Sequence, residues 1–446
     1  MSKLMVSVSG VRGIVGEGLT PKRVMNFAQA FGDFVKSGKV VVGRDTRVTG
    51  DMMKNAVSAG LLATGCDILD IGICPTPTTQ LAVENLKADG GIMITASHNP
   101  IMWNGLKLIG SDGLFLDAQQ GEEVLRLAQQ ESFALVSWDK IGVAVHYSKA
   151  VEEHLEAILA LDYIDVTQIH SRTFRVVLDC VCGAGSVMLP ELLHRMGCEI
   201  IPINCDPSGR FPRDPEPVPE NLTELCDVVK KEGADLGLAV DPDSDRLALV
   251  SEKGEPLGEE RTLALAVKFI LTKKSGPVAI NASTSRATED VARAAGSKVF
   301  RTKVGEINVA KKMREIGAVI GGEGNGGVIL PDIHLGRDAP AGIALTLQHL
   351  AEFGGTLSEL NSTLPHYVIT KDKVALGNID PQAALAKIQK KYAHENLDLT
   401  DGVKIVRGHS WVHIRPSNTE PIIRVIAEAP TEAEANNLCA EIKGNF

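Results

Sequence analysis

The sequence predicts an α/β protein made of three related α/β domains with mixed, mostly parallel sheets, followed by a small C-terminal α+β domain. Two observations support this fold class. Short apolar runs alternate with helix-length segments, which is the pattern of βαβ units, and the pattern starts again twice further along the chain. A chain of 446 residues is expected to divide into domains, because single hydrophobic cores rarely grow beyond about 250–300 residues.

The first α/β unit is clearest in residues 39–71. An apolar strand at 39–43 precedes a helix at 52–64 that has one apolar face, and Gly65 ends that helix. The next strand follows at 66–71. A strand, a helix and a second strand in this order indicate parallel pairing.

The same order of elements recurs twice. The second unit starts with a strand at 174–179 and a helix at 187–196. The third starts with a strand at 277–281, which is followed by a helix at 288–295 and a strand at 297–300. We therefore expect three domains of one kind.

The character of the chain changes after Tyr367. Short strands are expected at 401–407, 411–415 and 422–427, followed by an amphipathic helix at 431–443. This pattern is typical of a small α+β domain. The predicted domains span residues 1–150, 151–255, 256–366 and 367–446.

The composition excludes several classes of function. A formal net charge of −10 disfavours binding to nucleic acid or to an acidic membrane surface. No apolar run is long enough to cross a membrane, and the eight cysteines are scattered rather than arranged as a disulfide framework. We expect a cytoplasmic protein, a monomer or a homodimer, that binds a small molecule and neither nucleic acid nor membrane.

The most informative motif is Thr-Ala-Ser-His-Asn-Pro at residues 95–100, which follows the apolar run at 92–94. Asn-Pro turns the chain away from the strand. Ser97 is thus a candidate nucleophile at a strand corner, with His98 beside it. Taken alone, the motif fits an ordinary loop better, because neighbouring serine and histidine residues are common in loops.

A second motif places three carboxylates at alternate positions between two strands, at Asp241, Asp243 and Asp245. Carboxylates in a bent loop can converge on one hard cation. A calcium EF-hand is the alternative, since Glu252 also fits its spacing, but Arg246 occupies the position that requires glycine in that loop. Arg246 also argues against a solvated acidic turn, because a cation beside a metal cluster suits a phosphate ligand.

Two further motifs suit a sugar and a phosphate. Residues 321–327 contain five glycines, and they leave Glu323 and Asn325 as the side chains able to bind sugar hydroxyls, with a flexible linker as the alternative. Residues 415–421 lie between two expected strands and combine an arginine with short polar side chains. Such a turn can bind an anion, although a polar hairpin is the plainer interpretation.

The four motifs together resemble those of the α-D-phosphohexomutase family. Residues 95–100 match that family's phosphoserine loop, Thr-(Ala/Gly)-Ser-His-Asn-Pro, and residues 241–246 match its metal loop, Asp-x-Asp-x-Asp-Arg. Its sugar loop begins Gly-Glu, as residues 322–325 do, and its phosphate loop, Arg-x-Ser-(Asn/Gly)-Thr-x-Pro, is similar to residues 415–421. The four motifs follow one another along the chain in the order expected for that family. The resemblance implies four domains around a central cleft.

The resemblance implies a phosphoryl relay through a phosphoserine at Ser97. One Mg²⁺ per chain would be bound by Asp241, Asp243, Asp245 and the phosphoserine, and a glucose or glucosamine 1,6-bisphosphate would act as activator. Lys107 is implied as the general base, with a pKa lowered by neighbouring cations. The catalytic residues implied are Ser97, Lys107, Arg12, His98 and Arg246. The substrate-binding residues implied are Lys303, Glu323, Asn325, Arg415, Ser417, Asn418 and Thr419.

The implied reaction interconverts a hexose or hexosamine 6-phosphate and its 1-phosphate. We expect glucosamine phosphate as the substrate, with a phosphomannomutase/phosphoglucomutase as the alternative. Bacterial family members that act on glucosamine usually have serine and then histidine in the sugar loop, and residues 323–327 depart from that pattern. A sugar phosphatase and a non-catalytic sugar-phosphate sensor are less favoured, because Ser97 and the three aspartates are all present.

Overall fold

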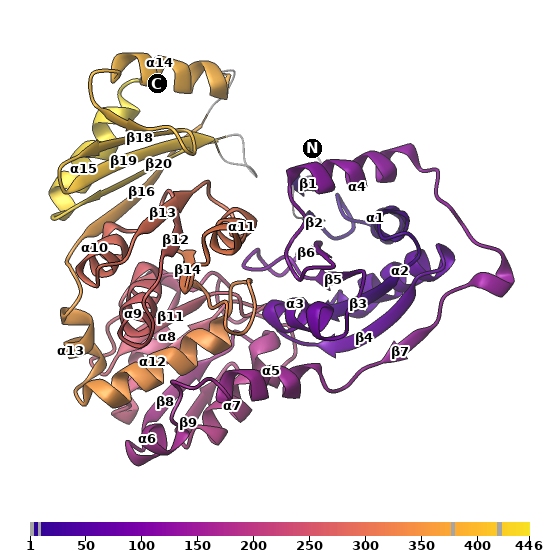
Figure 1. Cartoon of the computed structure of the whole chain (residues 1–446), viewed down its shortest axis with the longest axis horizontal. Coiled ribbons are helices and arrows are strands. Elements are labelled where there is room, and N and C mark those ends of the chain that lie inside the picture. The colour runs from indigo at the N-terminus through magenta and orange to yellow at the C-terminus, as the bar shows by residue number, and fades with distance from the viewer. Residues whose placement is uncertain (1–3, 8–9, 376–379, 417–421) are drawn as a thin grey trace.

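The computed structural model describes residues 4–7, 10–375, 380–416 and 422–446, and it contains four sheets. Figure 1 shows the first unit, in indigo and purple, on one side of the molecule, and the last unit, in yellow, beyond the third on the other side. The predicted architecture of three α/β units and a smaller α+β unit is confirmed.

The first sheet has seven strands in the order β1-β2-β6-β5-β3-β4-β7. Its strands are β1 (Leu4–Ser7), β2 (Gly10–Ile14), β3 (Lys39–Arg44), β4 (Asp67–Ile73), β5 (Gly90–Ile94), β6 (Trp103–Gly110) and β7 (Ala144–His146). Its helices are α1 (Pro21–Phe34), α2 (Gly50–Ala63), α3 (Thr76–Asn85) and α4 (Ala118–Gln130), with a 3₁₀ turn at Trp138–Lys140. Because β3 pairs in parallel with both β4 and β5, the carboxyl ends of these strands meet at one edge.

The second sheet has the order β11-β10-β8-β9. Its strands are β8 (Arg175–Asp179), β9 (Glu199–Ile203), β10 (Leu236–Val240) and β11 (Leu247–Ser251). The helices of this part are α5 (Ala150–Leu159), α6 (Val166–Ser171), α7 (Leu189–Arg195) and α8 (Thr223–Glu232), with 3₁₀ turns at Ala184–Val187 and Pro219–Asn221. β10 and β11 are antiparallel and fully buried, so the loop between them is positioned by the core.

The third sheet has the order β13-β12-β14-β15. Its strands are β12 (Val278–Asn281), β13 (Val299–Thr302), β14 (Ile320–Glu323) and β15 (Gly327–Ile329). Its helices are α9 (Glu259–Lys273), α10 (Arg286–Ala294), α11 (Glu306–Ile316), α12 (Ala339–Phe353) and α13 (Leu357–Ser362). One apolar cluster runs through the second and third sheets and includes α9 and α12. These two units therefore share a core.

The last sheet has the order β16-β20-β19-β18-β17, and all of its described pairs are antiparallel. Its elements are β16 (Val368–Ala375), α14 (Pro381–Lys391), β17 (Asn396–Asp398), β18 (Val403–Arg407), β19 (Ser410–Pro416), β20 (Ile422–Ala429) and α15 (Glu432–Lys443). It has a separate apolar core. Among the described helices of the whole chain, none combines the length and the apolar character that crossing a bilayer requires.

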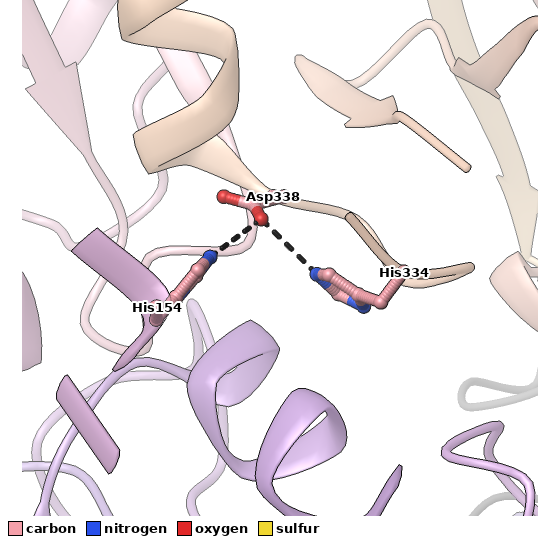
Figure 2. Close-up of side chains that lie close together, drawn as sticks. All are labelled: His154, His334 and Asp338. Carbon is pink, nitrogen blue, oxygen red and sulfur yellow. Dashed lines mark hydrogen bonds and ion pairs between the residues drawn. The ribbon is translucent and has the colours of Figure 1, made fainter. Parts of the chain in front are cut away.

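A buried cluster joins three parts of the chain (Figure 2). Asp338 Oδ2 lies 2.8 Å from His154 Nε2 in α5 and 3.0 Å from His334 Nε2. His154 Nδ1 is 2.9 Å from the Thr78 hydroxyl of α3. Asp338 is also the N-cap of α12, where its Oδ1 accepts from the Ala341 N–H at 2.8 Å.

The hydrogen bonds show which ring nitrogen of His334 carries a proton. The N–H of Gly336 donates to His334 Nδ1 at 3.0 Å, so the proton of that ring is on Nε2 and is donated to Asp338. The Asp338 carboxylate thereby accepts from both histidines and from the helix backbone. Its pKa lies well below the usual range, because the contacts with His154 and His334 outweigh burial.

We expect Asp338→Asn to destabilise the fold. The amide oxygen keeps the helix cap, but the NH₂ group then faces two imidazole donors, and a mismatched buried polar group costs about 2–4 kcal/mol. Urea unfolding measures the change. Asp332→Asn is the control, since this aspartate is on the surface and pairs with Lys274, and surface ion pairs contribute little. Equal midpoints for the two variants would contradict the assignment.

Candidate active site

Ser97 lies in a tight turn directly after β5. Thr95 Oγ1 accepts a hydrogen bond from the Ser97 N–H at 2.9 Å. Ser97 has a φ of +50°, a left-handed conformation that is uncommon for residues other than glycine and that clusters at functional turns. The side chain is buried at 1% exposure, and the next two residues, His98 and Asn99, line the central cleft.

Arg47 supports this turn, and we did not predict it from the sequence. Its guanidinium donates to four backbone carbonyls at 2.6–2.9 Å, those of Ser97, Asn99, Pro100 and Trp103. Its Nε donates to Asp45, which also accepts from the Thr95 hydroxyl at 2.6 Å. A signal was available: Asp45 and Arg47 come directly after β3, which lies beside β5 in the sheet.

The three aspartates of the predicted metal loop lie together between β10 and β11. All three are fully buried, and one carboxylate oxygen from each lies within 4.8 Å of the others. The Ser97 hydroxyl donates to Asp241 Oδ2 at 3.0 Å. The structure thus brings the candidate nucleophile to this loop across 144 residues of sequence.

The donor set of this loop fits a hard divalent cation. Asp243 Oδ1 and Asp245 Oδ1 are buried and have no hydrogen-bond partner among the described residues. Burial raises the pKa of Asp241, and the neighbouring charges of Asp245 and Asp243 raise it further. A buried carboxylate oxygen without a partner is costly, and oxygen ligands are those that Mg²⁺ prefers.

Lys107, on β6, forms ion pairs with two of these aspartates. Its Nζ lies 2.6 Å from Asp243 Oδ2 and 2.8 Å from Asp245 Oδ2. Burial alone would lower the pKa of Lys107, but the two carboxylates outweigh burial and raise the pKa above its ordinary value. The expectation of a lowered pKa is therefore wrong for this arrangement, because we considered the neighbouring cations and not the aspartates.

The other predicted catalytic side chains line the same cleft. Arg12 donates to Asn99 Oδ1 at 3.3 Å, and Arg246 donates to Glu216 Oε1 at 2.9 Å. His98 Nδ1 is 3.4 Å from Ser97 Oγ. Burial lowers the pKa of His98 well below its usual range, and Arg246 and Arg12 add to the effect, so His98 is neutral at physiological pH.

The glycine-rich segment is an ordered hairpin between β14 and β15, not a flexible linker. Glu323 is buried, and its Oε1 accepts from Asn281 Nδ2 at 2.9 Å and from the Gly305 N–H at 2.8 Å. Gly326 has a φ of +88°, and a Cβ there would lie 2.4 Å from the Leu247 carbonyl oxygen. Glu323 and Asn325 both line the cleft.

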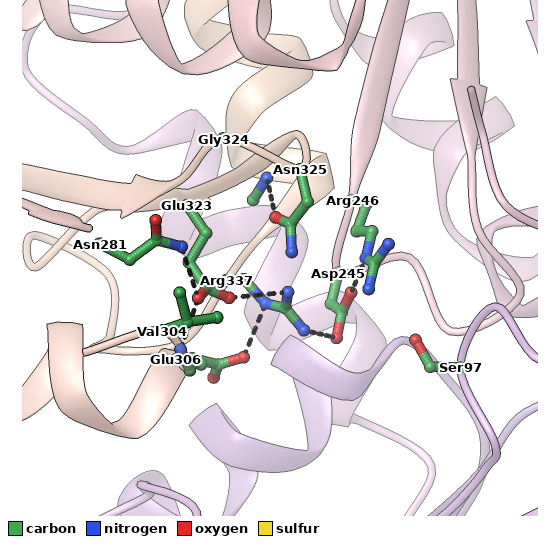
Figure 3. Close-up of polar contacts among 12 residues, drawn as sticks. Ser97, Asp245, Arg246, Asn281, Val304, Glu306, Glu323, Gly324, Asn325 and Arg337 are labelled. Atoms are coloured by element: carbon green, nitrogen blue, oxygen red, sulfur yellow. Dashed lines mark hydrogen bonds and ion pairs between the residues drawn. The ribbon is translucent and has the colours of Figure 1, made fainter. Parts of the chain in front are cut away.

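A second arginine that we did not predict from the sequence lies beside this hairpin (Figure 3). Arg337 forms ion pairs with Asp245, Glu306 and Glu323 at 2.7, 2.9 and 3.1 Å. Nothing in the local sequence indicates this role, because its partners lie 14 to 92 residues away.

The predicted phosphate loop is described only in part. Arg415, at the end of β19, lines the cleft, as does Lys303. Burial lowers the pKa of Arg415. Ser417, Asn418 and Thr419 lie outside the described residues.

One cleft of about 1520 Å³ is lined by residues of all four units. Lys107 and Arg12 come from the first unit, Arg246 from the second, Glu323 from the third and Arg415 from the fourth. A cleft lined by several cationic side chains and by a carboxylate suits an anionic, hydroxyl-bearing ligand.

Sequence profiles of one family match most of the chain. The profile of phosphoglucomutase/phosphomannomutase alpha/beta/alpha domain I matches residues 3–135, that of domain II matches residues 152–254, and that of domain III matches residues 259–367. The profile of the C-terminal domain matches residues 370–444.

Individual proteins are similar over nearly their whole length. The chain is 40% identical to a probable phosphoglucosamine mutase of Methanopyrus kandleri, covering 96% of this chain and 95% of that protein. It is 41% identical to a phosphoglucomutase/phosphomannomutase of Thermococcus kodakarensis, covering 96% of this chain and 94% of that protein. The crystal structure of a phosphoglucomutase/phosphomannomutase family protein from Burkholderia thailandensis superposes with a TM-score of 0.87 at 26% identity. The match covers 99% of this chain and 96% of that protein's chain. With its four domains and its cleft, the chain belongs to the phosphoglucomutase/phosphomannomutase family, the α-D-phosphohexomutases.

Proposed function

We propose that the chain interconverts glucosamine 6-phosphate and glucosamine 1-phosphate through a phosphoserine at Ser97. The broader prediction of a phosphohexomutase is confirmed by the family profiles and by relatives at 35–41% identity. The observation that carries the proposal is the hydrogen bond of 3.0 Å from Ser97 Oγ to Asp241. It puts a serine hydroxyl at a carboxylate cluster suited to a divalent cation, as phosphoryl transfer requires.

The preference for glucosamine rests on the names of the relatives. Seven of the relatives at 35–41% identity are named probable phosphoglucosamine mutase, in Methanopyrus, Pyrococcus, Thermococcus, Methanococcoides and Methanosarcina. The Thermococcus relative at 41% identity is named phosphoglucomutase/phosphomannomutase. That relative makes a glucose or mannose phosphate mutase the second candidate.

In the relay, the phosphate of Ser97 passes to the free hydroxyl of the sugar monophosphate. The Ser97–phosphate bond breaks as the new ester bond forms, which gives a 1,6-bisphosphate. The sugar then turns end for end, and the Ser97 hydroxyl takes the other phosphate. A 1,6-bisphosphate from solution would restore a lost phosphoserine by the same reaction.

One Mg²⁺ would be bound by Asp241, Asp243, Asp245 and an oxygen of the phosphoserine. When bound, Mg²⁺ supplies positive charge that stabilises the transferring phosphoryl group. Arg12 and Arg246 add cationic groups at this end of the cleft. Because such transfer depends on positioning and electrostatics, these side chains carry most of the proposed catalysis.

The rest of the substrate would be bound by the third and fourth units. Glu323 and Asn325 would meet the sugar hydroxyls, and Lys303 lines the same cleft. Arg415, Ser417, Asn418 and Thr419 bind the phosphate that does not react. Because this phosphate site is separate from Ser97, it can bind either phosphate of the bisphosphate, and the sugar can face Ser97 with either end.

Lys107 can act as the general base only when the carboxylates that face it are neutralised. Asp243 and Asp245 raise its pKa, whereas burial, Arg337 and Arg12 lower it. Once positive charge offsets the two aspartates, the lowering effects remain. A proton can then pass from the sugar hydroxyl to Lys107 Nζ.

We expect Ser97→Ala to abolish isomerisation, with kcat reduced by about 1000-fold or more, because no other residue carries the phosphate. Coupled assays of 1-phosphate formation and of free phosphate release measure this. Ser171→Ala, an exposed position at the end of α6, is the control. Near-normal isomerisation in Ser97→Ala would refute the relay, and phosphate release without isomerisation would indicate a phosphatase.

The substrate preference is measured by kcat/KM for the 6-phosphates and 1-phosphates of glucosamine, glucose and mannose. We expect glucosamine to be favoured by about tenfold or more, since a site that pairs with a polar group discriminates against sugars that lack it. Higher values for glucose or mannose would establish the second candidate. Binding without turnover of any of the sugars would indicate a sensor.

We expect Lys107→Met to tighten Mg²⁺ binding while lowering kcat by about 100-fold or more. The ammonium competes with a cation for Asp243 and Asp245, so its loss favours the metal and removes the base. Calorimetry measures Mg²⁺ affinity separately from activity. Lys303→Met is the control from the same cleft and should leave Mg²⁺ affinity unchanged. Weaker Mg²⁺ binding in Lys107→Met would contradict this competition.

A further inference from the structure

Arg337 contacts the sugar loop and the metal loop with one guanidinium group (Figure 3). Its Nη1 donates to Glu323 Oε2 at 3.1 Å, and its Nη2 donates to Asp245 Oδ2 at 2.7 Å. Its Nε donates to Glu306 Oε2 at 2.9 Å. Three carboxylates from three separate segments therefore share one cation.

The guanidinium is rigid and its position is determined by packing. Arg337 is 8% exposed, and a planar fork with fixed donors cannot release one carboxylate without changing its angle to the others. A Cβ at Gly327 would lie 2.2 Å from Arg337 Cδ. The glycine of the hairpin thus leaves the space that the arginine side chain occupies.

Two of these three carboxylates, those of Glu323 and Asp245, are also held in orientation by other contacts. Glu323 Oε1 already accepts from Asn281 and Gly305, so Oε2, which accepts from Arg337, is the oxygen with capacity for a sugar hydroxyl. Asp245 Oδ2 accepts from Arg337 and Lys107. Its Oδ1 has no hydrogen-bond partner among the described residues.

We propose that Arg337 is a positioning residue that links the sugar site to the metal loop. A sugar hydroxyl on Glu323 and a cation on Asp245 then act on the two ends of the same guanidinium, so occupancy of one site changes the affinity of the other. This inference rests on the roles proposed above for Glu323 and Asp245. It adds a residue whose effect is on coupling and not on the reacting atoms.

If Arg337 links the two sites, a substitution of Glu323 should change the affinity of the metal loop for Mg²⁺. In Glu323→Gln the neutral amide attracts Arg337 less, so the guanidinium interacts more strongly with Asp245 and competes with the cation. We expect the Mg²⁺ dissociation constant to rise about fivefold, and to change less than twofold when the same substitution is made in Arg337→Lys. Lysine keeps the charge but cannot bridge two carboxylates in this geometry.

The experiment is a double-mutant cycle with Mg²⁺ alone as the ligand, measured by calorimetry. All proteins carry Ser97→Ala, which removes differences in phosphorylation. Arg407→Lys is the matched control, because Arg407 also lies between two glutamates, Glu395 and Glu441, in the last unit away from the cleft. In the Arg407→Lys variant, Glu323→Gln should raise the Mg²⁺ dissociation constant about fivefold, as it does in the parent protein.

The outcomes separate the link from the proposed function. If no protein binds Mg²⁺, the proposed metal loop is wrong. If Mg²⁺ binds and Glu323→Gln changes its affinity equally with and without Arg337, the effect is a direct electrostatic field and the link is refuted. If Glu323→Gln leaves the Mg²⁺ dissociation constant unchanged both in the parent protein and in Arg337→Lys, the link is also refuted. Should Arg337→Lys not fold, Gly327→Ala replaces it, because the added methyl group displaces the Arg337 side chain.

Discussion

Buried negative charge is the constraint on which this site depends. Three aspartates of one loop are fully buried together, and the free energy of transferring them from water is high unless cations compensate. Lys107 from the first unit and Arg337 from the third provide that compensation. The loop is therefore stable only where three units meet, and the same contacts that join the units build the candidate metal site. Two carboxylate oxygens still lack hydrogen-bond partners among the described residues, which is the capacity that a divalent cation would use.

The turn that carries the candidate nucleophile Ser97 is stabilised in the same way, because a buried cation faces its backbone oxygens. Ser97 has a left-handed conformation that other packing must enforce. Arg47 does so through four carbonyls of the turn, while Asp45 binds both Arg47 and the Thr95 hydroxyl. The resulting rigidity directs the Ser97 hydroxyl at Asp241. A turn that moved freely would lose the orientation on which phosphoryl transfer depends.

The fold and the four loops could be predicted because each is encoded locally. The strand expected at 39–43 is β3, and the helix expected at 52–64 is α2, with ends that differ by one or two residues. The motifs at 95–100 and 241–246 each follow a buried strand, so their places at sheet edges could be inferred. The bounds between the domains remain a prediction, and the shared core of the second and third units was not foreseen. Arg47 and Arg337 escaped prediction because their partners lie up to 56 and 92 residues away.

The error over Lys107 shows why a family pattern is not enough to assign a charge state. Two opposing effects act on this lysine, since burial and nearby arginines lower its pKa while Asp243 and Asp245 raise it. The sequence places an arginine beside the aspartates and gives no distances, so it cannot decide which effect dominates. The structure shows both carboxylates within 3 Å of Nζ, and at that distance they dominate. The charge on Lys107 therefore depends on what else occupies the loop, so the proposed acid–base role of Lys107 and the binding of a cation would be parts of one equilibrium.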